Sequence, residues 1–151
     1  MTAVIQRVFG ATVYADGVLS GKIDKGLYIL LGVAAGDTEE DARLLSEKIS
    51  KLRIFSDENG KMNLSLLDIL GEALVVSNFT LNANYAHGNR PDYLGSAPPK
   101  EANELYEKFI SFLKEKIQKV ESGRFGADMR TEMSTDGPVT IVMQSSVLKK
   151  K

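Results

Sequence analysis

LYILLGV, at residues 27–33, is the stretch that decides the fold, because it is apolar along almost its whole length. A strand with one face in water alternates apolar and polar residues, whereas a strand covered on both faces does not. Residues 27–33 are therefore predicted to form a central strand of a sheet, with both faces buried.

The segments before this strand also have the composition of strands. Residues 3–15 are rich in Val, Ile, Phe and Tyr with partial alternation, and residues 18–23 lead toward the central strand. Asp16-Gly17 between them is a hairpin turn signal. Residues 3–35 are therefore expected to form consecutive strands.

Two amphipathic helices are expected. The first has Asp37 or Thr38 as its N-cap and acidic residues in its first turn, where the helix dipole favours them, and it ends near Arg53. The second begins near Pro98-Pro99, since proline is favoured at the start of a helix. Both have apolar residues at intervals of three or four. These residues are Ala42, Leu45, Ile49 and Leu52 in the first helix and Ala102, Leu105, Tyr106, Phe109, Ile110, Leu113 and Ile117 in the second.

Strands and loops fill the rest of the chain. Residues 74–81, LVVSNFTL, have the pattern of another buried strand, and residues 82–99 are rich in Gly, Asn and Pro, as in a long surface loop. In the last third, strands around 125–133 and 139–145 are expected to be joined by a turn at 134–138.

This order of elements indicates the α/β class, with a mixed, largely antiparallel sheet, a barrel-like core and two packed helices in one domain over residues 1–151. So many strands in a short chain leave exposed sheet edges, which must be covered or protected. A homodimer that covers one edge is therefore expected.

The composition limits the possible chemistry. Of the 151 residues, 43% are hydrophobic and 26% charged, and there is no Cys. Disulfides, thiolate nucleophiles and Cys-bound metals are thus excluded, and the one histidine, His87, is too little for the usual hydrolytic zinc site. Neither a metal nor a cofactor is expected. Any catalysis must use backbone groups, hydroxyls, carboxylates or the substrate itself.

Nothing in the sequence indicates a membrane or a nucleic-acid partner by itself. No run approaches the roughly 18 apolar residues of a membrane helix, and the first residues lack the order of a signal peptide, so a cytoplasmic location is expected. The net charge of −1 gives no global signature of nucleic-acid binding, although a local patch can still bind RNA. The lysines at 149–151 are the one visible basic run, and they form either such a patch or a solubilising tail.

Two short segments contain residues whose types are unusual for a position that serves only the fold. SNFT, at residues 77–80, places hydrogen-bonding side chains at the end of an apolar strand, although a strand leaving the core also explains it. DGP, at residues 136–138, combines a turn signal with a proline that withholds a ladder donor at the start of the next strand. A turn that enters an edge strand explains this segment too.

These segments resemble the signature motifs of the D-aminoacyl-tRNA deacylase family. The family carries Ser-Gln-Phe-Thr-Leu and Asn-x-Gly-Pro-x-Thr, and this chain has SNFTL at 77–81 and TDGPVT at 135–140. Further agreement lies at AVIQRV (3–8), GDT (36–38), GKMNLS (60–65), GNRP (88–91) and GRFGADM (123–129). On this resemblance, which covers nearly the whole length, the chain is identified as a member of the family.

Membership implies hydrolysis of the ester that joins a D-amino acid to the terminal ribose of tRNA, and of mischarged glycyl-tRNA(Ala). It also implies a homodimer in which each subunit lends Gly137-Pro138, with a cis peptide bond, to its partner's pocket. Carbonyl oxygens there can accept hydrogen bonds from the substrate ammonium, while an L side chain is driven into the backbone. The expected partners are the second subunit and the aminoacylated 3′ end of tRNA, with no membrane and no DNA.

The resemblance places catalysis at Ser77, Asn78, Phe79 and Thr80. The backbone N–H groups of Phe79 and Thr80 are candidates for an oxyanion hole. Thr80 is either the nucleophile, or it only orients the ester while the ribose 2′-hydroxyl assists the attacking water. We favour the second role, because a threonine nucleophile needs a nearby base.

The resemblance also gives roles to residues outside the two motifs. Arg7 would steady the Gly-Pro segment and Met129 would border the pocket, with a salt bridge in the sheet and ordinary core packing as the respective alternatives. His87, Arg90 and Lys100, in or beside the long loop, would contact tRNA phosphates, although most loop charges are merely solvated.

Several positions depart from the family pattern. Asn78 replaces a glutamine and so loses one methylene of reach, and Thr135 replaces an asparagine. Asn89 stands where arginine is frequent, and Asp92-Tyr93 replaces Ser-Phe, which weakens contact with phosphate. The alternative reading is therefore a divergent, catalytically weak paralogue that acts as a nucleic-acid-binding dimer. A metal- or nucleotide-dependent enzyme is disfavoured, since neither a Walker loop nor a His-rich cluster is present.

Overall fold

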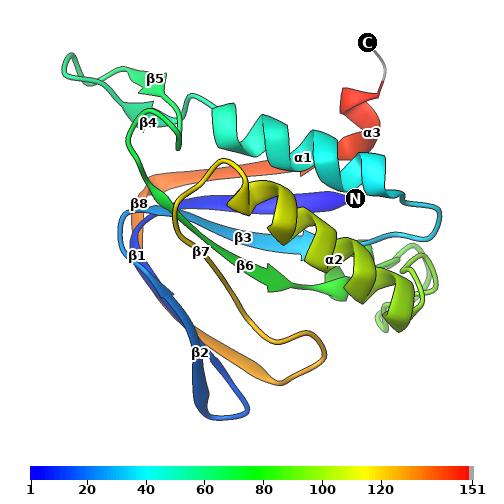
Figure 1. Cartoon of the computed structure of the whole chain (residues 1–151). Helices are drawn as coiled ribbons and strands as arrows, with labels where there is room; N and C mark the ends of the chain where they lie inside the picture. The colour runs from blue at the N-terminus through cyan, green and yellow to red at the C-terminus, as the bar shows by residue number, and fades with distance from the viewer. Residues whose placement is uncertain (150–151) are drawn as a thin grey trace.

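The computed structural model describes residues 1–149 and is built around one mixed six-stranded sheet (Figure 1). Its strands are β1 (Thr2–Ala15), β2 (Val18–Ile23), β3 (Gly26–Gly32), β6 (Glu72–Ser77), β7 (Val120–Ser122) and β8 (Met129–Gln144). They follow the order β2-β1-β3-β6-β7, and β8 pairs with β1. The remaining elements are the β4 (Phe55–Ser56) and β5 (Met62–Leu64) pair, α1 (Glu39–Lys51), α2 (Pro99–Lys114), α3 (Ser145–Leu148) and the 3-10 helix η1 (Phe79–Asn82).

β1 is the strand on which the sheet is organised. Its first half pairs antiparallel with β3, its second half pairs antiparallel with β2, and β8 runs antiparallel along its other side. Asp16 and Gly17 connect β1 to β2 with positive φ angles of 48° and 79°, as the hairpin signal predicted.

The sheet is nearly closed into a barrel. β2 folds back toward β7, where the Ser20 hydroxyl donates to the Ser122 carbonyl at 2.8 Å. The two strands approach so closely that a Cβ on Gly21 would lie 3.0 Å from the Glu121 Cβ. The prediction of a mixed, largely antiparallel, barrel-like sheet is confirmed, with β3–β6 and β6–β7 as the parallel pairs.

The predicted central strand is β3, which lies between β1 and β6 and is buried at every residue except Leu30. α1 and α2 cover one face of the sheet (Figure 1), and the core forms between them and the strands. Thr38 caps α1, and its N–H donates to Asp41 Oδ2 at 2.8 Å. Both predicted helices are confirmed, and in residues 1–149 none is long and apolar enough to cross a membrane.

The last strand differs from the prediction. Residues 129–144 form the single strand β8 instead of two strands joined by a turn. Its register on β1 skips between Val8↔Thr135 and Gln6↔Thr140, so residues 136–138 bulge out of a strand that continues in the same direction. The predicted turn is therefore wrong: pairing of both halves with β1 outweighs the local Asp-Gly signal.

β6 is also shorter than predicted. It ends at Ser77, and the last part of the expected strand forms η1. The physical reason is Asn78, whose side chain accepts a hydrogen bond from the Thr80 N–H and so diverts the backbone into a helical turn.

Candidate active site

A cavity of about 780 Å³ opens at the C-terminal ends of β3 and β6. It lies between η1, the start of α2 and the loop at 123–128, and its lining is mostly apolar or aromatic. Asp128 is the one charged residue among the lining residues. A cavity of this size and character suits a small organic ligand or one end of a larger one.

Parallel pairing with β3 carries the SNFT segment to this cavity. Ser77 pairs with Leu31, and the Asn78 N–H donates to the Leu31 carbonyl at 2.8 Å. Ser77, Asn78 and Phe79 consequently line the cavity, whereas Thr80 lies just outside its wall.

Asn78 fixes the position of Thr80. Asn78 Oδ1 accepts a short hydrogen bond from the Thr80 hydroxyl and a second one, of 3.3 Å, from the Thr80 N–H. The Phe79 N–H, in contrast, has no hydrogen-bond partner in the described part of the chain. Of the two expected oxyanion donors, the structure therefore leaves Phe79 free and engages Thr80.

Aromatic side chains form much of the cavity wall. Phe79 is 59% exposed and meets Tyr93 edge to face, with ring centroids 5.0 Å apart. Tyr106 is buried beside Phe125, and its hydroxyl donates to the Val75 carbonyl at 3.0 Å. Burial raises the pKa of Tyr106 above its ordinary value, so its phenol stays neutral at physiological pH.

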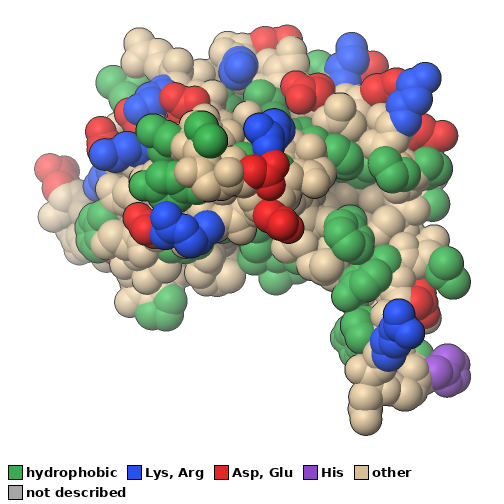
Figure 2. Space-filling model, turned by 90° about the horizontal axis from the view of Figure 1, so that it is seen from below, with side chains coloured by type: hydrophobic (Ala, Val, Ile, Leu, Met, Phe, Trp, Pro, Cys, Tyr) green, Lys and Arg blue, Asp and Glu red, His purple; other side chains and the backbone are tan. Residues whose placement is uncertain are grey.

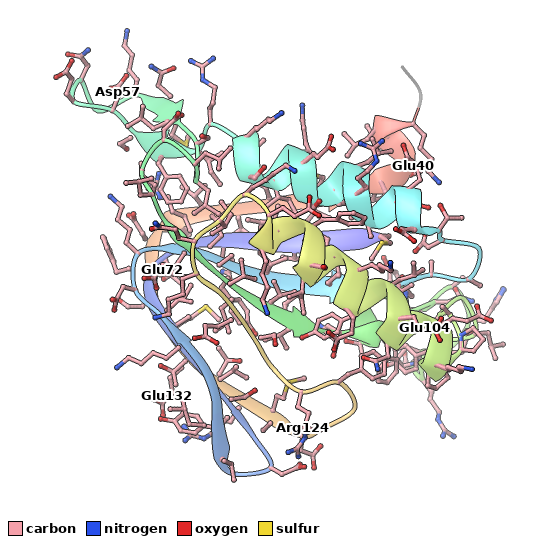
Figure 3. The ribbon with its side chains drawn as sticks, viewed as in Figure 1. Glu40, Asp57, Glu72, Glu104, Arg124 and Glu132 are labelled. Atoms are coloured by element: carbon pink, nitrogen blue, oxygen red, sulfur yellow. The ribbon has the colours of Figure 1, made fainter. Side chains whose placement is uncertain are left out.

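Met129 begins β8 and lines the cavity. A Cβ on Gly123 would lie 2.4 Å from Met129 Sδ, so glycine at that position makes room for the methionine. The loop between them is held by Asp16, which donates its N–H to the Asp128 carbonyl at 2.8 Å and accepts from the Asp128 N–H at 3.1 Å. Arg124, at the outer end of the loop, forms an ion pair with Asp16 (Figure 3).

Gly137-Pro138 lies in the β8 bulge, away from the cavity, and its peptide bond is cis. Arg7 holds the residue before it: the guanidinium Nε is 3.1 Å from Asp136 Oδ2 and donates to the Asp136 carbonyl at 3.3 Å. The same guanidinium donates to the Ile54 carbonyl at 2.7 Å. Arg7 thus contacts the Gly-Pro segment, and it does so through a salt bridge.

Within one chain the two motifs are far apart. Ser77 pairs with Leu31, which pairs with Ala3, whereas the bulge lies beside Arg7. β8, β1, β3 and β6 are consecutive across the sheet, so the two motifs are three strand spacings apart across it. Along the strands they are offset by four residues, the distance from Ala3 to Arg7 on β1. At about 3.3 Å per residue and about 4.8 Å per strand, the separation is roughly 20 Å.

The loop after η1 forms an arm that projects from the body of the molecule (Figure 2). Asn84 and Asp92 close its base with backbone hydrogen bonds of 2.9 Å in both directions, and Asn84 Nδ2 donates to Asp92 Oδ2 at 3.0 Å. His87 and Arg90 are exposed on the arm, and Lys100 is exposed in the first turn of α2. Asp92 therefore braces the arm, a role that its sequence position did not indicate.

Most of the cavity wall was not identified from the sequence. Ser96, Phe125 and Asp128 lie at its surface together with Tyr93. The sequence singled out Tyr93 only as a departure from the family pattern, and Phe125 and Asp128 only as part of the GRFGADM agreement, without a role in the site. These residues come from separate segments that only the fold brings together. In residues 1–149, no group of three or more His, Asp or Glu side chains is placed to hold a metal ion.

Sequence comparison points to one family. The family model for D-Tyr-tRNA(Tyr) deacylase matches residues 4–144. A Thermosipho africanus (strain TCF52B) protein named D-aminoacyl-tRNA deacylase is 54% identical over 145 residues, covering 96% of this chain and 97% of its own length. A protein of the same name from Clostridium botulinum (strain Alaska E43 / Type E3) is 51% identical over 146 residues, covering 97% of this chain and 98% of its own.

Solved structures share the fold. A protein named c-Myc DNA Unwinding Element Binding Protein superimposes with a TM-score of 0.89 at 37% identity, over 95% of this chain and 98% of its own. A probable eukaryotic D-amino acid tRNA deacylase superimposes with a TM-score of 0.83 at 16% identity, over 95% of this chain and 99% of its own. At that identity the second likeness concerns the fold alone.

Proposed function

This chain belongs to the D-Tyr-tRNA(Tyr) deacylase family, and from that membership we propose that it hydrolyses the ester bond of D-aminoacyl-tRNA to free D-amino acid and tRNA. Water adds to the ester carbonyl carbon, and the ribose oxygen leaves with a proton. The observation that carries the proposal is the placement of Ser77, Asn78 and Phe79, from the family motif, in the wall of a largely apolar cavity.

The cavity suits the 3′-terminal nucleoside of an aminoacyl-tRNA. Unpaired bases are bound by stacking on aromatic side chains and by hydrogen bonds at their edges. At the cavity, Phe79 offers an exposed ring and Tyr93 a half-buried one, and Ser96 and Asp128 offer polar groups at its surface. About 780 Å³ is also within the usual range for pockets that hold a ligand of this size.

The free Phe79 N–H is the donor that we assign to the oxyanion. A preorganised N–H aimed at developing negative charge is a large term in ester hydrolysis. Thr80 is a positioning residue in this proposal, because its hydroxyl proton and its N–H are both directed to Asn78 Oδ1. The ribose 2′-hydroxyl, which is adjacent to the ester, then assists the attacking water.

Discrimination between D and L esters requires a second copy of the chain. The Gly137-Pro138 bulge lies roughly 20 Å from its own cavity by strand spacing, so it can act only at the cavity of a partner. A homodimer would also cover the free edge of β8, where Val142 is 66% exposed and Met133 36% exposed.

In the assembled site, carbonyl oxygens of the bulge accept hydrogen bonds from the substrate ammonium. With the ammonium and the ester both held, an L side chain points into the backbone at Gly137-Pro138 and a D side chain points away from it. Glycine has no side chain to reject, so glycyl-tRNA(Ala) is also a substrate. His87 and Arg90 on the arm and Lys100 on α2 contact tRNA phosphates, and the cytoplasm is the place of action.

The test is ester loss from D-Tyr-tRNA, L-Tyr-tRNA and Gly-tRNA(Ala) at matched enzyme concentration, without added metal. Rapid loss of the D-tyrosyl and glycyl esters with the L-tyrosyl ester spared is the expected result. Equal loss of the D- and L-tyrosyl esters would refute the chiral gate.

A second candidate function is nucleic-acid binding without catalysis. It is favoured by the similar solved protein that is named for binding a DNA element, and by the replacement of the family glutamine by Asn78. The same assay separates the two functions: tight binding of tRNA with no loss of any ester would favour this alternative.

A further inference from the structure

Basic side chains gather at the C-terminal end of α1. This α1 basic cluster consists of Lys48, Lys51 and Arg53, which are all exposed and which line a surface depression of about 470 Å³ together with Leu44, Glu47, Leu52 and Leu148. Glu47 is bound to Arg43 at 2.8 Å. Across residues 1–149, none of the three cations forms an ion pair with a carboxylate.

One further carboxylate lies within reach of the cluster. Arg53 attracts the Asp68 carboxylate electrostatically, but Asp68 Oδ2 already accepts hydrogen bonds from the Ser65 hydroxyl at 2.9 Å and from the Ser65 N–H at 2.8 Å. Arg53 itself donates to the Asn63 carbonyl at 2.9 Å, which holds it beside the β4–β5 hairpin. The turn of this hairpin begins at Asp57, which is labelled in the upper left of Figure 3. The cluster therefore keeps most of its positive charge free for an external anion.

A short series of contacts connects the cluster to the Gly-Pro bulge. Arg53 precedes Ile54, whose carbonyl accepts from Arg7 at 2.7 Å. Arg7 in turn lies 3.1 Å from the carboxylate of Asp136, the residue before Gly137. Arg53 is thus linked through Ile54 and Arg7 to the residue before Gly137, so the Arg53 end of the cluster lies near the bulge.

In the dimer proposed above, the bulge of one protomer reaches the cavity of its partner, which would bring the Arg53 end of the cluster toward the rim of that cavity. The substrate's terminal nucleoside occupies that cavity, and the rest of the tRNA must leave across the rim as a chain of phosphates. Exposed Lys and Arg side chains without carboxylate partners bind such a polyanion and release its counterions. We infer that the α1 basic cluster of one protomer binds the backbone phosphates of the acceptor end of a tRNA held in its partner's cavity.

The inference rests on the proposed function. It adds a set of tRNA phosphate contacts that come from the second protomer. Arg90 and Lys100 belong to the protomer that owns the cavity, whereas Lys48, Lys51 and Arg53 belong to the other. The acceptor end is then held between the two chains, and each subunit contributes both a cavity and a phosphate-binding surface.

The first experiment compares a full substrate with one that has no phosphates beyond the cavity. D-Tyr-tRNA and D-tyrosyl-adenosine are hydrolysed by the unmodified protein and by the triple variant Lys48→Ala, Lys51→Ala, Arg53→Ala. For D-Tyr-tRNA we expect KM to rise about tenfold or more, and the slope of log kcat/KM against log salt to flatten by about one for each phosphate that is no longer neutralised. For D-tyrosyl-adenosine we expect no change.

A matched control removes the same number of charges elsewhere. The triple variant Lys22→Ala, Lys108→Ala, Lys114→Ala should leave KM for both substrates unchanged. These exposed side chains belong to β2 and α2 and not to the end of α1 that is linked to the β8 bulge. Lys51→Glu offers a single-residue check and should raise KM for D-Tyr-tRNA further than Lys51→Ala does. Unchanged KM and salt slope in the α1 variants would overturn the inference. If the proposed function itself is wrong, the unmodified protein will cleave neither ester.

The second experiment asks which chain contributes the cluster. A chain with its cavity closed by Ala127→Trp, inactive as a homodimer, is paired through two affinity tags with a chain whose cavity is open. Adding the α1 triple substitution to the closed chain should raise KM for D-Tyr-tRNA, because that chain faces the working cavity. Adding it to the open chain should have no effect, and the reverse pattern would contradict the cross-subunit contact.

Discussion

Arg7 and Asp136 are joined by three contacts: two from the guanidinium to the carboxylate oxygens, at 3.1 and 3.2 Å, and one to the backbone carbonyl, at 3.3 Å. Their side chains are only 11% and 22% exposed, so water competes little for these contacts. Because Arg7 belongs to β1 and is also bound to Ile54, the position of the Gly-Pro bulge is set by the sheet rather than by the bulge itself.

Arg7→Lys is expected to loosen the bulge while leaving the fold intact. Lysine keeps the charge but cannot reach the Asp136 carboxylate, the Asp136 carbonyl and the Ile54 carbonyl at once. The ratio of kcat/KM for D-Tyr-tRNA over L-Tyr-tRNA should fall by about tenfold, which is about 1.4 kcal/mol of discrimination. Arg43→Lys, on the surface of α1, is the matched control and should leave that ratio as it is.

Gly137→Ala should abolish the selective site. Gly137 has φ of +135°, and an added Cβ would lie 2.5 Å from the Val139 backbone nitrogen, so the bulge must move. We expect loss of D-ester hydrolysis by at least about 100-fold in kcat/KM, since misplacing a binding group by about 1 Å has effects of this size. Gly36→Ala tests whether strain alone is responsible, because Gly36 has φ of +86° but open space around it. Wild-type rates in Gly137→Ala would contradict the role of the bulge.

Asn78 and Thr80 should respond differently to substitution. Asn78→Ala frees both groups of Thr80 that Asn78 Oδ1 holds, and it should lower single-turnover deacylation by about tenfold or more. Thr80→Ala should retain deacylation within about tenfold if the ribose 2′-hydroxyl assists the water. A loss of several orders of magnitude in Thr80→Ala would mean that its hydroxyl is the nucleophile.

Asp41 should make the stability of the fold depend on pH. It is 2% exposed; burial raises its pKa, but hydrogen bonds from Lys149, Ser145 and Thr38 more than offset this and leave the pKa well below its ordinary value. A carboxyl group with a depressed folded-state pKa stabilises the fold above its unfolded pKa of 3.8, and this stabilisation is lost as the pH falls.

Asp41→Asn is therefore expected to lower the free energy of unfolding by about 2–3 kcal/mol at pH 7. The difference between wild type and variant should shrink as the pH falls below about 4. Urea unfolding at pH 7, 4 and 2.5 measures it, with Glu58→Gln as a control at an exposed turn. A difference that is constant over this range would show that Asp41 acts through shape and not through charge.

Local signals predicted much of the fold. The apolar run at 27–33, the Asp16-Gly17 turn and the Thr38 cap each depend on a few neighbouring residues, and each element lies where it was expected. β8 was mispredicted because Asp136-Gly137 signals a turn locally, whereas its pairing partner Val8 lies more than a hundred positions away in the sequence. Non-local pairing of this kind leaves no mark in a short window of sequence.

The site was predictable only in part, for a similar reason. Residues 77–80 could be named as a motif, but the end of β6 at Ser77 depends on the side chain of Asn78 turning back onto Thr80. The cavity wall at Phe125 and Asp128 depends on the pairing of Asp16 with Asp128 across two loops. The link between Arg53 and the bulge surface, likewise, exists only because Arg7 reaches the Ile54 carbonyl.

The sharing of one site between two copies is tested most directly by mixing two inactive chains. Ala127→Trp closes the cavity but keeps the bulge, and Gly137→Ala displaces the bulge but keeps the cavity. A mixed dimer purified through two tags contains one intact cavity facing one intact bulge, and it should recover about half of the wild-type rate on D-Tyr-tRNA while sparing L-Tyr-tRNA. A mixed dimer as inactive as its two parents would contradict the shared site.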